Sequence, residues 1–225
     1  MGGMSGREGP AFSFEEENCL TSRTALEVLV DQGIATEGGL AAGIAALPDC
    51  RFEVHDNVGP SKATAVFDVA HNPAALARLF QTTTRRFPNV PLRVVLGLSS
   101  KKDAAKCVAE LQKCSLHSLH LVTDDHNQKA AGVETLEDAA RAAGLEVKSD
   151  GSCSVELALA SYLLSVFQVE ELVEGGDVEA TVRTAVDIAG RKGEVVVVCG
   201  SFMIMHEAKS GMCIPTLERD PIHLR

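Results

Sequence analysis

Apolar and polar positions follow two alternating patterns along most of the chain. From residue 65 onward, short apolar runs are followed by longer segments in which apolar side chains recur at helical spacing. The pattern predicts strands at 65–68, 92–97, 117–123, 145–148 and 194–199, and helices at 73–86, 102–113, 134–143, 153–167 and 177–190. Such alternation is typical of a mostly parallel sheet with helices on both faces. We therefore expect a Rossmann-like α/β fold.

The first part of the chain has a different pattern. Residues 14–32 carry acidic side chains in the first turn and an apolar stripe, which predicts an amphipathic helix. A second short helix is predicted at 37–46, a strand at 52–56, a turn at 57–62 and a polar loop at 169–177. We divide the chain into a disordered segment (1–13), a short helical stub with a linker (14–60) and an α/β domain (61–225).

A run of polar side chains follows the first strand of the α/β region. Asp68, His71 and Asn72 lie between that strand and the helix starting at Pro73, where open α/β sheets usually hold ligands. Asn72 is a good N-cap and Pro73 suits the first helical position, so both have a structural explanation. Capping requires neither Asp68 nor His71. These two are therefore candidate functional residues.

Other polar groups lie at the ends of predicted elements. Ser99 or Ser100 could cap the helix at 102–113. Lys101 and Lys102 oppose its dipole, which indicates either a bound anion or a solvated surface. Two further residues, Ser201 after the last strand and Arg51 before the sheet, could contact a ligand, although a simple turn and a surface ion pair are the structural alternatives.

Composition narrows the classes of function. The net charge of −10 argues against nucleic acid or an anionic membrane as a partner, because binding to phosphate backbones needs a basic surface. The seven cysteines are scattered, which favours reduced thiols. No secretory signal, long apolar run, phosphate loop or metal-ligand spacing occurs, so we expect a cytoplasmic protein and assign no metal site.

The polar runs also resemble a known family. FDVAHNP is similar to the D-G-A-H-N motif of folylpolyglutamate synthases and bifunctional dihydrofolate synthases, within the Mur-ligase superfamily. Four further segments resemble the family in the same order along the chain. Its N-A-x-x-A-x-x-A-L helix is similar to FEEENCLTSRTALEVL, and its W-P-G-R-x-E linker to LPDCRFEV. Its F-G-x-x-x-D-K-D segment is similar to GLSSKKD, and its closing strand and turn to VVVVCGSFMIMHEAK. Two departures stand out: Val69 replaces a family glycine, and Asp49-Cys50 replaces Pro-Gly before Arg51.

The resemblance implies an ATP-dependent ligase of the Mur C-terminal domain type. Such an enzyme joins glutamate to folate or dihydropteroate through an acyl phosphate and uses Mg²⁺. By motif match, Asn18 and Arg51 would contact ATP and Asp68 a ribose hydroxyl. His71 would be a catalytic residue near the phosphates or the incoming glutamate, and Lys101, Lys102 and Ser201 would be weaker contacts to substrate.

The resemblance also implies that most of an ATPase domain is missing from the sequence. In the family that domain carries the phosphate loop and the magnesium ligands. We therefore expect the chain alone to be inactive, and the full-length protein to contain a central ATPase domain. Two alternatives remain: another Mur-type amino-acid ligase, for example one acting on peptidoglycan precursors, and a non-catalytic Rossmann-like binding module.

Overall fold

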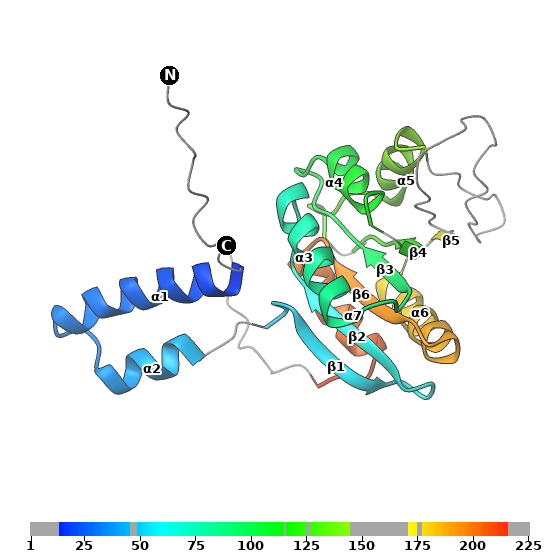
Figure 1. Ribbon diagram of the computed structural model, residues 1–225. Coiled ribbons are helices and arrows are strands. Elements are labelled where there is room, and N and C mark those ends of the chain that lie inside the picture. The colour runs from blue at the N-terminus through cyan, green and yellow to red at the C-terminus, as the bar shows by residue number, and fades with distance from the viewer. Residues whose placement is uncertain are drawn as a thin grey trace, which may run out of the picture. The chain divides into compact units, whose positions relative to one another are not determined.

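The chain forms two compact units, Met1–Asp49 and Cys50–Arg225. The computed structural model describes residues 14–45, 49–114, 116–124, 127–144, 171–174 and 177–215 (Figure 1). In the first unit, α1 (Phe14–Asp31) and α2 (Glu37–Ala45) contact each other, and both predicted helices are confirmed. No residue from 18 to 44 is buried. Residues 1–13, which we expect to be disordered, lie outside the described residues.

The second unit contains a six-stranded sheet in the order β1-β2-β6-β3-β4-β5. Its strands are β1 (Glu53–Val58), β2 (Ala63–Asp68), β3 (Leu92–Leu96), β4 (Leu116–Leu121), β5 (Glu171–Glu174) and β6 (Val195–Cys199). Four of the pairings are parallel, and only β1 runs antiparallel to its neighbour β2. The expected mostly parallel sheet is confirmed.

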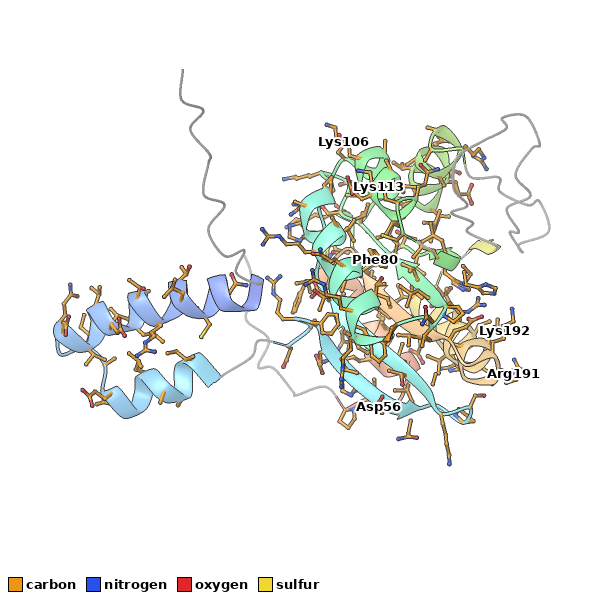
Figure 2. The ribbon with its side chains drawn as sticks, in the orientation of Figure 1. Asp56, Phe80, Lys106, Lys113, Arg191 and Lys192 are labelled. Carbon is orange, nitrogen blue, oxygen red and sulfur yellow. The ribbon has the colours of Figure 1, made fainter. Side chains whose placement is uncertain are left out.

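Helices cover both faces of this sheet (Figure 1). One core cluster joins the sheet to α3 (Pro73–Arg86), α4 (Ala104–Leu111) and α5 (Val133–Ala142), and the other joins it to α6 (Val178–Lys192) and α7 (Met205–Gly211). Phe80 on α3 is buried, whereas the charged side chains of Lys106, Lys113, Arg191 and Lys192 extend outward (Figure 2). Among the described helices, none is long and apolar enough to cross a membrane.

Local sequence explains several of these elements. All five residues of β6, V-V-V-V-C, are buried, as expected for a central strand covered on both faces. Helix α3 begins as predicted: Asn72 accepts a hydrogen bond from the Ala75 backbone N–H at 2.9 Å, and Pro73 takes the first helical position. Helix α6 begins at an Asp177 cap and ends at Gly193 in the left-handed conformation.

The structure differs from the sequence-based expectation in three places. Helix α4 begins at Ala104 and is capped by Asp103, so the prediction of a Ser99 or Ser100 cap is wrong. Strand β5 lies where a loop was predicted at 169–177, because it pairs with β4. The second unit begins at Cys50 rather than at the expected residue 61, because β1 pairs with β2. The predicted strand 145–148 and helix 153–167 lie outside the described residues.

A buried ionic cluster joins Arg93 on β3, His120 on β4 and Glu194 directly before β6. The Arg93 Nε donates to Glu194 Oε2 at 2.7 Å, and Arg93 Nη1 lies 2.9 Å from His120 Nε2. Arg93 and His120 are fully buried, and Glu194 is 4 % exposed. Burial, followed by the charge of Arg93, lowers the pKa of His120 to about 3. His120 is therefore neutral in the folded protein at neutral pH.

Candidate functional site

The carboxyl ends of β2 and β6 form the centre of the candidate site. The chain leaves β2 for α3 on one face of the sheet, and leaves β6 for α7 on the other. A crevice where neighbouring strands lead to opposite faces is the usual ligand site of an open α/β sheet. Asp68 ends β2 and pairs with Cys199, which ends β6. The sequence-based choice of this strand end thus coincides with the topological switch point.

The Asp68 carboxylate is bound to the protein backbone. Its Oδ2 accepts a hydrogen bond from the Phe52 N–H at 2.9 Å, and its Oδ1 accepts one from the Ala70 N–H at 2.8 Å. Burial raises the pKa of the Asp68 carboxyl, although these two bonds and the charge of Arg51 oppose the increase. Asp68 is only partly buried, so its oxygens remain able to accept further bonds. It therefore has a structural role that its motif did not predict.

Arg51 lies in a short turn with unusual backbone geometry. We call residues 50–52 the Arg51 turn. Cys50 and Phe52 have φ values of 57° and 47°, in the left-handed region, and Arg51 between them is exposed. Non-glycine residues held there cost on the order of 1–3 kcal/mol each. Cys50 replaces the family glycine, which would adopt this conformation freely. Val69, the second residue that replaces a family glycine, is not among the residues with positive φ.

Glu53 and Lys209 form a second anchor beside this turn. The Glu53 carboxylate accepts from the Cys50 N–H at 2.8 Å and from Lys209 Nζ at 2.8 and 2.9 Å. His55 Nε2 lies 2.7 Å from Glu53 Oε1. Lys209 is 6 % exposed, and its Nζ lies 5.7 Å from the centroid of the Phe67 ring.

These hydrogen bonds outweigh the effect of burial on the pKa of the Glu53 carboxyl. Burial alone would raise the pKa of the Glu53 carboxyl, but the hydrogen bonds from Lys209, Cys50 and His55 together lower it to about 2. Sequence reasoning missed this pair because its members are 156 residues apart. The available signal was the R-F-E match to the R-x-E of the linker, which includes Glu53.

His71 follows Asp68 in the loop between β2 and α3. Its Nδ1 lies 2.9 Å from the Val69 carbonyl oxygen, which can only accept a hydrogen bond. In the neutral ring Nδ1 therefore carries the proton and Nε2 is the acceptor. Because His71 is half-buried, its Nε2 can accept a proton or hydrogen bond from a ligand at this edge.

Ser201 follows β6 at the same edge of the sheet. Its Oγ accepts from the Met203 N–H at 3.2 Å, and so caps the short helix η1 (Phe202–Ile204). Gly200 before it has φ +109°, and a Cβ there would lie 2.2 Å from the Gly97 carbonyl oxygen. Glycine is therefore required where the ends of β3 and β6 approach each other.

Lys101 and Lys102 are exposed and lie in the turn before α4 rather than on the helix itself. They directly precede the Asp103 N-cap, so they lie at the amino end of α4, which is the positive end of its dipole. Ser100 Oγ donates to the Lys129 carbonyl oxygen at 3.2 Å, so the loops after β3 and β4 meet. Lys129 thereby lies beside the Lys101–Lys102 turn.

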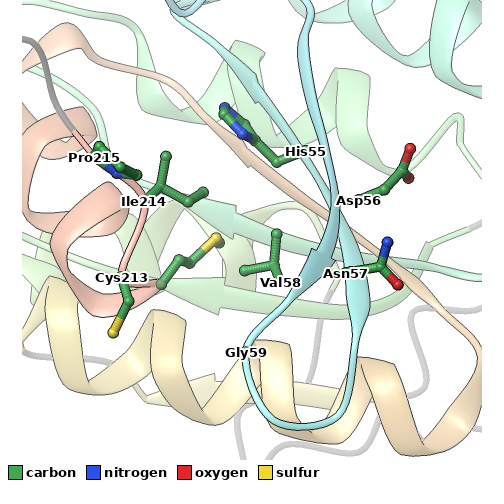
Figure 3. A pocket seen from close by; sticks show the side chains of 9 residues that line it. His55, Asp56, Asn57, Val58, Gly59, Cys213, Ile214 and Pro215 are labelled. Carbon is green, nitrogen blue, oxygen red and sulfur yellow. The ribbon is translucent and has the colours of Figure 1, made fainter.

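Asn18 lies on α1 in the first unit, where it is exposed. Within the described part of the chain, no group of three or more His, Cys, Asp or Glu residues could hold a metal ion. A pocket of about 410 Å³ opens between the β1–β2 turn and the residues after α7 (Figure 3). It adjoins the amino end of β2, so it is separate from the edge that carries Asp68.

Comparison with solved structures shows that the fold is shared. The bifunctional folylpolyglutamate synthase/dihydrofolate synthase of Yersinia pestis is 24% identical, with a TM-score of 0.56 over 85% of this chain. The folylpolyglutamate synthase of Thermotoga maritima is 17% identical, with a TM-score of 0.57 over 91% of this chain. A third, Mycobacterium tuberculosis folylpolyglutamate synthase, is 22% identical, with a TM-score of 0.54 over 83%.

The chain spans less than two fifths of each of these proteins, which it covers over 38%, 39% and 36% of their lengths, respectively. Comparison with curated proteins gave no match. The family model of the Mur ligase, glutamate ligase domain, matches residues 50–202, which include the Arg51 turn and all six strands. On this match and the shared fold, the chain belongs to the Mur ligase family and contains its glutamate ligase domain.

Proposed function

We propose that the chain is the C-terminal part of an ATP-dependent ligase that joins glutamate to folate or dihydropteroate. The observation that carries this proposal is the arrangement at the carboxyl end of β2. There the Asp68 carboxylate holds the Phe52 N–H, and the exposed Arg51 lies within electrostatic reach of Asp68. A cation and an acceptor at a switch point fit a ligand with phosphates and hydroxyl groups.

The ligands of the structural relatives support this choice. The Yersinia pestis enzyme is complexed with AMPPNP and Mn ion, and a bifunctional enzyme of the same kind has Mn, AMPPNP and L-glutamate bound. E. coli FolC is in complex with DHPP and ADP. Adenine nucleotide, glutamate and a folate precursor are thus the ligands that we propose for the complete protein.

We assign the following roles to the candidate residues. Arg51 binds the nucleotide phosphates, and Asp68 accepts from a ribose hydroxyl while it holds the backbone. His71, through Nε2, accepts a proton from the amine of the incoming glutamate. Lys101, Lys102 and Ser201 are weaker contacts to the glutamate carboxylates. Asn18 contacts the adenine side.

We assign the phosphate loop and the magnesium ligands to a central ATPase domain outside this sequence. ATP supplies the phosphate that activates the folate carboxyl group. The part played by the chain itself is to bind glutamate, orient its amine and exclude water from the activated carboxylate.

Two assays of ADP release test the proposal. The chain with ATP, Mg²⁺, dihydropteroate or tetrahydrofolate, and glutamate should release no ADP; release would contradict the need for a second domain. A chimera in which residues 50–215 replace the corresponding domain of the Yersinia pestis enzyme should release ADP in a glutamate-dependent way. Dependence on another amino acid would instead favour a different Mur-type ligase. A chimera that binds AMPPNP but shows no turnover with any amino acid would favour a non-catalytic module.

A further inference from the structure

The Arg51 turn is fixed by hydrogen bonds on both sides of Arg51. Glu53 accepts from the Cys50 N–H and Asp68 accepts from the Phe52 N–H, at 2.8 and 2.9 Å. The Cys50 carbonyl oxygen also accepts from the Val69 N–H at 3.0 Å. Two carboxylates from different strands thus hold alternate amides of one short turn.

This anchoring matters because the turn is not in a relaxed conformation. The left-handed φ values of Cys50 and Phe52 are unfavourable for side-chain-bearing residues, so the turn would relax if its bonds were removed. The backbone that sets the direction in which the Arg51 side chain leaves the turn would then be free to move. An exposed arginine binds a phosphate group well only when its guanidinium is already oriented, because ordering it on binding costs free energy.

Lys209 is the residue that secures the Glu53 side of this arrangement. It is a buried ammonium on α7, it contacts both Glu53 oxygens, and its Nζ also lies over the Phe67 ring. Removing it would leave the Glu53 carboxylate partly buried without its main counter-charge. Glu53 would then turn toward water and release the Cys50 N–H.

We propose that Lys209, acting through Glu53, is a positioning residue that holds Arg51 in the conformation that binds the nucleotide phosphates. This role rests on the proposed function, because it takes Arg51 as a nucleotide contact. Neither Lys209 nor Glu53 touches the ligand. The proposal makes α7 a support of the binding site, although its sequence shows no nucleotide-binding motif.

The test combines amide hydrogen exchange with AMPPNP titration of the 225-residue chain, followed by NMR. In Lys209→Met, exchange at Cys50 and Phe52 should rise at least tenfold relative to wild type, and AMPPNP affinity should fall about tenfold. Lys209→Arg keeps the positive charge, so its exchange rates and AMPPNP affinity should be close to those of wild type. The matched control is Lys113→Met, which removes an exposed ion pair with Glu110 and should change neither measurement. If Lys209→Met does not fold, the double variant Glu53→Gln/Lys209→Met removes both charges and should show the same changes.

A double-mutant cycle separates positioning from a general structural effect. In an Arg51→Ala background, Lys209→Met should leave AMPPNP affinity unchanged, because its effect passes through Arg51. A further loss of affinity in that background would overturn the proposal, as would unchanged exchange at Cys50 and Phe52 in Lys209→Met. Absence of AMPPNP binding by the wild-type chain would contradict the proposed function instead, and exchange would still decide whether Lys209 holds the turn.

Discussion

The Asp68 carboxylate at the end of β2 accepts a hydrogen bond from the Phe52 backbone N–H, sixteen residues earlier in the chain. This bond joins the candidate ligand-binding carboxylate to the turn that carries Arg51. Binding and folding are therefore coupled at this residue, and a substitution of Asp68 affects both.

Asp68→Asn should destabilise the protein. The amide keeps one acceptor oxygen, so either the Phe52 N–H or the Ala70 N–H loses its partner. An unsatisfied buried amide costs about 1–3 kcal/mol, and we expect urea denaturation to show a loss of that size. Asp103→Asn is the control, because asparagine caps a helix as well as aspartate does. Equal unfolding free energies for wild type and Asp68→Asn would contradict the structural role.

His120 should make the protein sensitive to mild acid. Its pKa of about 3 lies below the ordinary 6.5, so between these pH values the unfolded chain binds a proton at this residue and the folded chain does not. The free energy of unfolding should therefore fall as pH decreases through this range, by up to ~1.4 kcal/mol per pH unit.

The measurement for His120 is a comparison of pH profiles. The His120→Gln variant keeps an acceptor for Arg93, and its free energy of unfolding should fall less steeply between pH 6.5 and 3 than that of wild type. The control His206→Gln, at an exposed residue of α7, should show the same pH dependence as wild type. Parallel profiles for wild type and His120→Gln would show that the buried imidazole does not couple folding to pH.

Gly200→Ala should be among the most damaging small substitutions at the site. The new methyl group would meet the Gly97 carbonyl oxygen, and φ of +109° is strained for alanine. We expect a loss of unfolding free energy of at least ~3 kcal/mol. Gly193→Ala separates strain from the clash, because its φ is +72° and nothing lies within 4 Å; it should cost about 1–2 kcal/mol. Similar losses for the two variants would assign the effect to backbone strain alone.

The first unit should be cleaved by protease before the second. Residues 18–44 contain no buried side chain, and Leu20, Val28 and Ile34 are exposed apolar cleavage sites for thermolysin. Native helices without a buried face open easily. Limited digestion followed by mass spectrometry should show early cuts in α1 and α2 and a protected fragment that includes Cys50–Lys113. Early cuts inside the sheet would contradict this order.

The parts of the fold that sequence predicted are those fixed by local pattern. The apolar run of β2 and the Asn72-Pro73 start of α3 depend on neighbouring residues, and both were predicted correctly. Strand β5 was missed because it is defined by pairing with β4, which is distant in sequence. The N-cap of α4 was misassigned because serine and aspartate are equally good caps.

The same distinction applies to the candidate site. Asp68, His71 and Arg51 were selected from motifs, whose positions are local information. The motif indicated a ligand contact for Asp68 and did not show that its carboxylate binds two backbone amides. The left-handed turn was not predictable, because no glycine marks it. The R-F-E match pointed to Glu53, but its pairing with Lys209 was not predictable because tertiary contact alone creates it.

The irregular backbone of strand β1 affects whether two molecules of this protein can pair through the edges of their sheets. As an outer strand it offers backbone groups to which a strand from a second molecule could bind. Its register shifts between His55 and Val58, and Asn57 in that interval has φ of 60°. Such a bulge bends the strand and interrupts the regular spacing of its outward amides. Edge-to-edge pairing of two molecules through β1 is thereby disfavoured.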